Sequence, residues 1–80
     1  MPPASTEDSV RSKVETDLRL MREILQKRGG WSDDFSATVS EQKQAAIARI
    51  KGDFTEAEQK AVATEVTRLF REFIANKGAA

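Results

Sequence analysis

Apolar residues recur at spacings of three and four along one stretch of the chain, from Val10 to Leu25. This spacing places side chains on one face of an α-helix, whereas a strand needs a two-residue period. The other side of the stretch carries charges of alternating sign every four residues, which stabilise a solvated helical face. Gly29 and Gly30 follow, and glycine favours the left-handed conformation that often ends a helix. The pattern predicts a helix that starts at Ser9 and has these core positions, which Ile24 widens: Val10, Val14, Leu18, Met21 and Leu25.

A second segment combines the start and end signals of a short helix. Ser40 is a favourable N-cap, because its hydroxyl can accept a hydrogen bond from a backbone N–H of the first turn. Gly52 ends the segment. We therefore expect a short helix over residues 41–50, with three buried positions: Ala46, Ile47 and Ile50. The preceding stretch, 31–39, is expected to be a polar loop that holds two aromatic residues.

The third segment begins at residues 55–58, where Thr-Glu-Ala-Glu is the pattern of a capping box. In such a box the first and fourth side chains each bond to a backbone N–H that the helix leaves unpaired. The helix is expected to run from about Thr55 to Asn76 and to end before Gly78. Its apolar residues gather on one side of a helical wheel: Val62, Val66, Leu69, Phe70, Phe73 and Ile74.

These elements predict an all-α fold, a small three-helix domain. Two long helices of similar length would pack antiparallel, and the short helix between them would cover one end of the pair. The 80 residues allow one domain, which we expect over residues 9–78. Residues 1–8 are rich in proline, serine and acidic side chains and are expected to be a disordered lead-in.

The chain has no cysteine, no histidine and no tyrosine. Their absence restricts the bonds, metal sites and catalytic groups that the chain can form. Disulfides are therefore excluded, and a zinc or iron site loses its strongest ligands. The commonest general bases and nucleophiles are missing as well. We expect no catalytic residues, no cofactor, no metal and no small-molecule substrate for so small a helical chain.

The charges balance, with 13 basic and 13 acidic side chains. A balanced chain lacks the general basic surface of a nucleic-acid-binding protein. The segment 40–63 still has the outline of a helix-turn-helix, with a turn at Gly52. Its second helix would open with the carboxylates of Glu56 and Glu58 where phosphates would lie, which opposes binding. A DNA-binding transcriptional regulator that uses this corner is the alternative function.

No apolar stretch approaches the length of a membrane span, and the first residues lack the apolar run of a signal peptide. The alternating charges of the first helix also differ from the lysine-rich face of a helix that lies on a membrane. We therefore expect a cytoplasmic protein without a membrane partner.

Asp17 lies in the middle of the apolar arc of the first helix. A carboxylate there must be paired, protonated or placed at a subunit boundary, because burying it alone is costly. One interpretation is an interface residue that meets a basic group of a partner. The other, which we favour, is a salt bridge within the chain, for example to Lys77 or Arg28 near the helix ends.

Trp31 and Phe35 also have two interpretations. Aromatic side chains are common interface anchors, because they bury a large area at a small entropic cost. They can equally close the open end of a three-helix core, which we favour for a chain with one tryptophan and four phenylalanines.

The apolar faces carry more large side chains than such a fold covers comfortably. Leu20 lies at the edge of the arc of the first helix, and Phe70 and Ile74 lie toward one edge of the third. Apolar edges on a small domain are most simply buried by a second copy or by a partner protein. The sequence therefore favours a protein–protein interaction module that acts as a regulator, inhibitor or adaptor and forms a homodimer. Its candidate partner-binding residues are Asp17, Leu20, Trp31, Phe35, Phe70 and Ile74.

Overall fold

The computed structural model describes residues 6–78, which form three α-helices joined by short turns. The helices are α1 (Thr6–Lys27), α2 (Asp33–Lys51) and α3 (Glu56–Ala75), and residues 6–78 contain no strand. The all-α, three-helix fold class predicted from the sequence is confirmed. None of these three helices is both long enough and apolar enough to cross a membrane.

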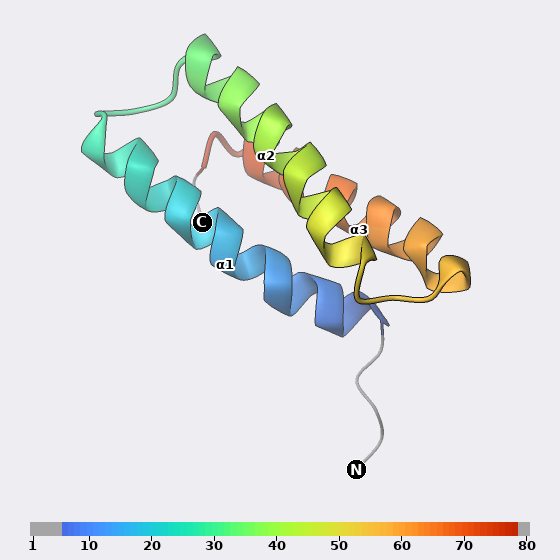
Figure 1. The fold of residues 1–80 in the computed structure, drawn as a ribbon. Helices are drawn as coiled ribbons and strands as arrows, with labels where there is room; N and C mark the ends of the chain where they lie inside the picture. Colours follow the sequence, from blue (N-terminus) through green and yellow to red (C-terminus); the bar gives the residue numbers. More distant parts are fainter. Residues whose placement is uncertain (1–5, 79–80) are drawn as a thin grey trace.

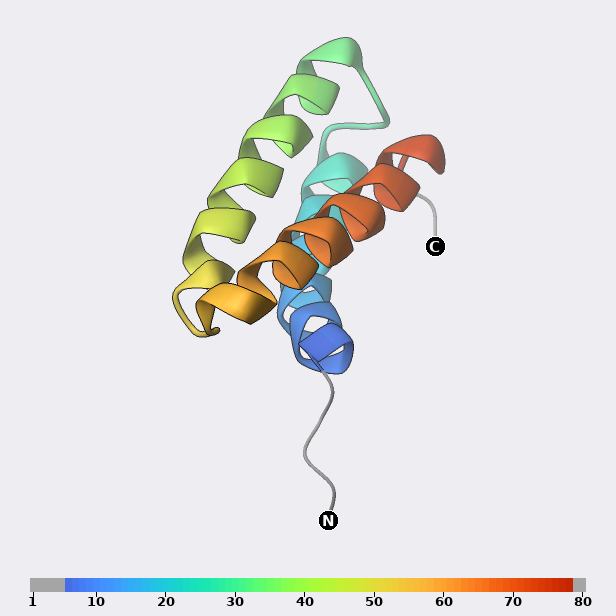
Figure 2. The same ribbon diagram turned by 90° about the vertical axis from the view of Figure 1, so that its right-hand side faces the viewer.

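The chain runs along α1, returns along α2 and runs out again along α3 (Figures 1 and 2). As a result, α1 and α3 point in the same direction. At their N-terminal ends, the Thr6 hydroxyl donates a hydrogen bond to Glu58 Oε2 at 2.8 Å. Near their C-terminal ends, Arg22 Nε donates to the carbonyl oxygen of Gly78 at 3.2 Å.

The antiparallel packing that we expected for the first and third helices is therefore wrong, and the length of α2 is the reason. With 19 residues, α2 is about 28 Å long. It carries the chain back to the end of the bundle at which α1 began, so α3 must start there. A helix confined to residues 41–50 would have been too short to return the chain over that length.

The first half of α2 is the stretch that we expected to be a loop. Ser32 acts as the N-cap, and its Oγ accepts a hydrogen bond from the backbone N–H of Phe35 at 3.3 Å. Asp33 and Asp34 follow in the first turn, where negative charge complements the partial positive charge of a helix N-terminus. The helix start predicted at Ser40 is thus corrected to Asp33, because a complete start signal already stands at residues 32–34.

α1 begins at Thr6, earlier than the predicted start at Ser9. Glu7 and Asp8 lie in its first turn, again with the charge that a helix N-terminus favours. The hydrogen bond of the Thr6 hydroxyl to Glu58 fixes this turn to α3. Of the predicted lead-in, residues 6–8 are therefore helical, and residues 1–5 lie outside the described residues.

The core lies between the three helices, and α1 contributes every position predicted for it: Val10, Val14, Leu18, Met21 and Leu25. The other two helices contribute Phe35, Val39, Ala46, Ile50, Val62, Val66, Phe70 and Phe73. Ile47, Leu69 and Ile74 are partly buried against this core. α1 and α3 pack most closely, whereas α1 and α2 are the least closely packed pair.

The capping box predicted at the start of α3 is present. Glu58 Oε1 accepts hydrogen bonds from the backbone N–H of Thr55 at 3.4 Å and from its hydroxyl at 2.8 Å. Together with the bond from Thr6, these hydrogen bonds hold the pKa of the Glu58 carboxyl below its ordinary value of 4.5. The box therefore connects the start of α3 to the start of α1.

Replacing Glu58 with glutamine is expected to lower the free energy of unfolding at neutral pH. In strong acid the same substitution should change the free energy of unfolding little. A carboxyl whose pKa is lower in the folded than in the unfolded chain stabilises the fold above its unfolded pKa. That contribution is lost as the pH falls through the folded-state pKa of Glu58. Urea unfolding at both pH values checks this, with Glu56→Gln, outside the box in the same turn, as the control. A Glu58→Gln deficit that is the same at both pH values would contradict it.

Candidate functional site

Among residues 6–78, two large apolar side chains are exposed, Leu20 at 56% and Ile24 at 43%. Both lie on α1, four residues apart, so they form one apolar patch. The patch borders a shallow hollow of about 120 Å³ between α1 and α2, which is lined by Asp17, Leu20, Met21, Ile24, Thr38 and Gln42. We name this surface the α1–α2 groove. Because Leu20 is exposed on it, Leu20 remains a candidate contact residue.

The α2 side of the groove is polar but carries no charge at the two residues that line it. Thr38 Oγ1 donates to the carbonyl oxygen of Asp34 at 3.2 Å, so its hydroxyl is already satisfied within α2. Gln42 is exposed beside it. Because the two residues of α2 that line the hollow are uncharged, covering them requires little desolvation of charge.

Asp17 closes one end of the groove through an ion pair with Arg49 of α2. The Asp17 side chain is 25% exposed and that of Arg49 is 64% exposed. The salt bridge within the chain is therefore present, with Arg49 as the partner in place of Lys77 or Arg28. The pair gives the apolar patch a polar rim three residues before Leu20 on α1.

Trp31 and Phe35 close the end of the core between α1, α2 and α3. The Phe35 side chain is 1% exposed, and its ring meets the Trp31 ring edge-on with 5.2 Å between centroids. Trp31 is half-buried and lies 6.2 Å from the ring of Phe73. The Arg28 guanidinium lies 5.2 Å from the centre of the Phe35 ring. Phe35 thus has no surface to offer a partner in this fold, and only part of Trp31 does.

The exposed apolar edge expected on the third helix is largely absent. Phe70 is fully buried at 0% exposure, and Ile74 is partly buried against the core. α2 packs along α3 over its length (Figure 2), and Phe70 belongs to the core between the helices. Phe70 is therefore corrected from a candidate contact residue to a core residue.

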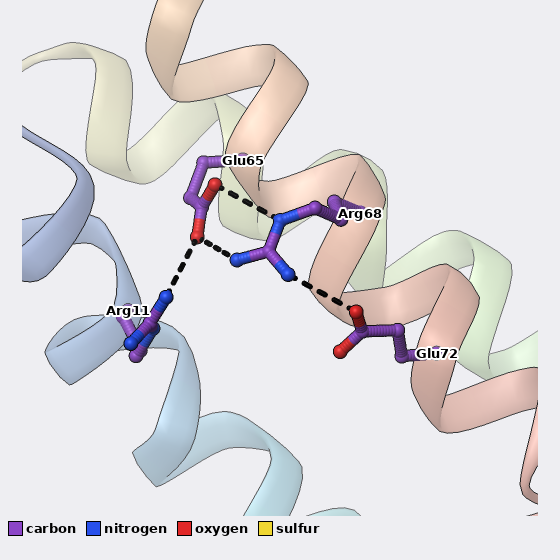
Figure 3. A network of polar contacts seen from close by, with 4 residues as sticks. All are labelled: Arg11, Glu65, Arg68 and Glu72. Carbon is purple, nitrogen blue, oxygen red and sulfur yellow. Dashed lines mark hydrogen bonds and ion pairs between the residues drawn. The ribbon is translucent and has the colours of Figure 1, made fainter.

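Sequence reasoning missed a network of ion pairs between α1 and α3, which Figure 3 shows. Its centre is Glu65, a carboxylate that is only 6% exposed. Glu65 accepts from Arg68 Nε at 3.2 Å and pairs with Arg11 of α1 at 3.9 Å. Arg68 also donates to Glu72 at 3.0 Å. These bonds, the one to Glu65 first, raise the pKa of the Arg68 guanidinium, so this side chain stays charged.

The network is structural in character, because each charge in it already has a partner. The signal in the sequence was the position of Glu65 at the edge of the apolar arc of α3, next to Val66 and three residues before Arg68. A buried carboxylate requires such partners, since it cannot lie there alone. The network joins α1 to α3 and leaves the α1–α2 groove untouched.

A second hollow, of about 360 Å³, lies between α1 and α3. Its basic residues are Arg19 and Arg22, and its acidic residues are Glu15 and Glu72. Arg22 is already engaged, because Nε binds the Gly78 carbonyl and the guanidinium lies 5.3 Å from the centre of the Phe73 ring. The mixed charges give this hollow no preference for an anionic or a cationic ligand.

The corner within residues 40–63, the possible helix-turn-helix, is an ordinary turn with acidic residues around it. Lys13 of α1 pairs with Asp53 in this turn and lies 5.3 Å from the centre of the Phe54 ring. Glu56 and Glu58 open α3 beside it. Phosphate contacts supply much of the affinity of DNA-binding helices, so this arrangement does not favour DNA. Within residues 6–78, no group of three or more acidic side chains is placed to hold a metal ion.

Comparison with known proteins gives no relative, since no protein-family model, no curated protein and no solved structure matches this chain.

Proposed function

We propose that this chain is a small helical protein–protein interaction module that acts as a regulator, inhibitor or adaptor and works as a homodimer. The observation that carries the proposal is the apolar patch of Leu20 and Ile24 in the α1–α2 groove. The other large apolar side chains of residues 6–78 are buried or packed against the core. The proposal includes no catalytic step, since histidine, cysteine and tyrosine are missing from the sequence.

Single exposed apolar side chains are normal on protein surfaces, but these two are adjacent, border a hollow and have a polar rim at Asp17. An apolar centre with a polar rim is the usual anatomy of a protein interface. Covering the exposed parts of both side chains contributes about 2–3 kcal/mol per copy. Two copies together contribute about 4–6 kcal/mol, whereas the loss of freedom on association costs at least about 4 kcal/mol. The patch alone therefore leaves little net affinity, and a stable complex needs further contacts along α1 and α2.

The proposal is tested by affinity purification of the tagged protein from a lysate of its source cells, divided into nuclease-treated and untreated halves. An interaction module should retain the same protein, in near-stoichiometric amount, in both halves. Its binding should also change little with salt, because apolar burial involves no release of counterions. Retention that disappears with nuclease and falls steeply with salt would instead support the alternative, a DNA-binding regulator with its site in the corner at 40–63.

A further inference from the structure

We propose that two copies associate through the α1–α2 groove, with α1 of one copy packed antiparallel against α1 of the other. In this arrangement Leu20 of each copy packs against Ile24 of the other copy. The inference rests on the homodimer proposed above and specifies its surface. It follows from two properties of this surface: how Asp17 and Lys27 are placed about the centre of the apolar patch, and how much area the groove offers.

Two charges of opposite sign on α1, Asp17 and Lys27, lie at equal distances from the centre of the patch. A two-fold axis midway between Leu20 and Ile24 brings each of these side chains level with its counterpart in the other copy. Asp17 lies five residues before this centre and Lys27 five residues after it. Antiparallel packing therefore places Asp17 of one copy level with Lys27 of the other, at both ends of the patch. Lys27 then joins the existing pair of Asp17 with Arg49.

The parallel arrangement of the same two helices is unfavourable. A two-fold axis along the helices would place each residue opposite itself, so Asp17, Glu23 and Lys27 would each face a like charge. Like charges across an interface oppose association and select against a wrong orientation. The charge pattern of α1 thus distinguishes between the two orientations and favours the antiparallel one.

The area available predicts a weak dimer. α1 is about 33 Å long, and its contact with one neighbouring helix is narrow. The uncharged Thr38 and Gln42 of α2 widen the surface, because a helix seated in the groove packs against both α1 and α2. The area that this contact can bury lies at or below the lower limit of standard protein interfaces. We therefore expect a dissociation constant in the micromolar range.

The test is sedimentation equilibrium of the full chain over a range from about 1 μM to 1 mM, which brackets the expected dissociation constant. Leu20→Glu places two carboxylates in the apolar centre of the dimer. Its matched control is Gln26→Glu, which makes the same charge change on an exposed residue of α1, about 120° around the helix from Leu20. Lys27→Glu is the second variant, because it places a carboxylate level with Asp17 of the other copy. Thermal unfolding by circular dichroism confirms that each variant is folded.

We expect Leu20→Glu to raise the dissociation constant at least about 30-fold, because both copies lose the central contact. Lys27→Glu should raise it about 3- to 10-fold, and Gln26→Glu should leave it within about 3-fold of the wild type. A wild-type dimer that Leu20→Glu leaves intact would overturn this surface while the proposed homodimer stands. A wild-type chain that is monomeric at every concentration would overturn both the surface and the homodimer. The affinity purification would then still test whether the chain binds a different protein.

Discussion

Replacing Phe73 with alanine is expected to lower the free energy of unfolding by about 3–5 kcal/mol. The Phe73 side chain is only 2% exposed. Its ring lies 6.2 Å from that of Trp31, in the turn after α1, and 5.3 Å from the guanidinium of Arg22 in α1, so truncation removes both contacts. Small domains have a total stability of about 5–15 kcal/mol, so this loss is a large fraction of the whole.

Urea unfolding followed by circular dichroism measures this loss. Arg71→Ala is the matched control, because Arg71 lies on the exposed side of the same helix and its removal should change stability by less than about 0.5 kcal/mol. If Phe73→Ala is unfolded without urea, Phe73→Leu retains part of the contact and gives a measurable value. A loss below about 1 kcal/mol for Phe73→Ala would show that the core face of α3 has been misassigned.

A proline at position 37 is expected to cost about 3 kcal/mol or more. Ala37 is exposed and lies inside the first half of α2, so the substitution removes no core contact. Proline there cannot donate the helical hydrogen bond, and its ring clashes with the carbonyl group of Asp33, four residues earlier. The same substitution in a loop over residues 31–39 would change stability little.

Asp33→Pro is the control for this second prediction, because Asp33 is the first residue of α2 and proline is tolerated there. Ser32 before it is extended, with φ −143° and ψ 164°, which is the conformation that a residue before proline prefers. We expect Asp33→Pro to change the free energy of unfolding by less than about 1 kcal/mol. Equal effects of Ala37→Pro and Asp33→Pro in urea unfolding would mean that residues 33–39 are not helical.

The sequence predicted α1 and α3 well, because both combine a continuous apolar period with a strong end signal. In α1 the five core positions follow one another without a gap, and Gly29–Gly30 ends the helix. In α3 the capping box at Thr55 and Glu58 placed the start, and the helix ends at Ala75 with Asn76 as its C-cap, one residue from the predicted end. For such elements the hydrophobic period alone determines both the helix and the face that it buries.

α2 was misjudged because its apolar positions are sparse. Between Val39 and Ala46 lie six residues of which only Ala45 is apolar, and this residue is exposed. The serine and threonine residues of the segment 36–40 are typical of loops, which favoured a loop there. Ser40 is a favourable N-cap residue, although it lies inside α2. The cap at Ser32 was the better signal, since two acidic residues and a buried aromatic follow it.

The wrong length of α2 also led to errors in the candidate contact residues. With α2 confined to residues 41–50, nothing paired Arg49 with Asp17 or placed Phe70 in the core, so both Asp17 and Phe70 were candidate contact residues. Leu20 could be recognised as an edge residue from α1 alone, because its position on the helical wheel does not depend on α2. Residue patterns on one helix are therefore predictable, whereas pairings between helices require their lengths and directions.

The parallel course of α1 and α3 has a mechanical consequence. Thr6 and Gly78 lie toward opposite ends of a bundle whose longest dimension is 41 Å (Figure 1). A pulling force applied between these two residues acts along the bundle, so it slides α1 lengthwise against α3. Sliding loads the ion pair of Arg11 with Glu65, the bond of Arg22 to Gly78 and the shared core together. Antiparallel outer helices would instead have been peeled apart from one end, with their contacts broken one after another.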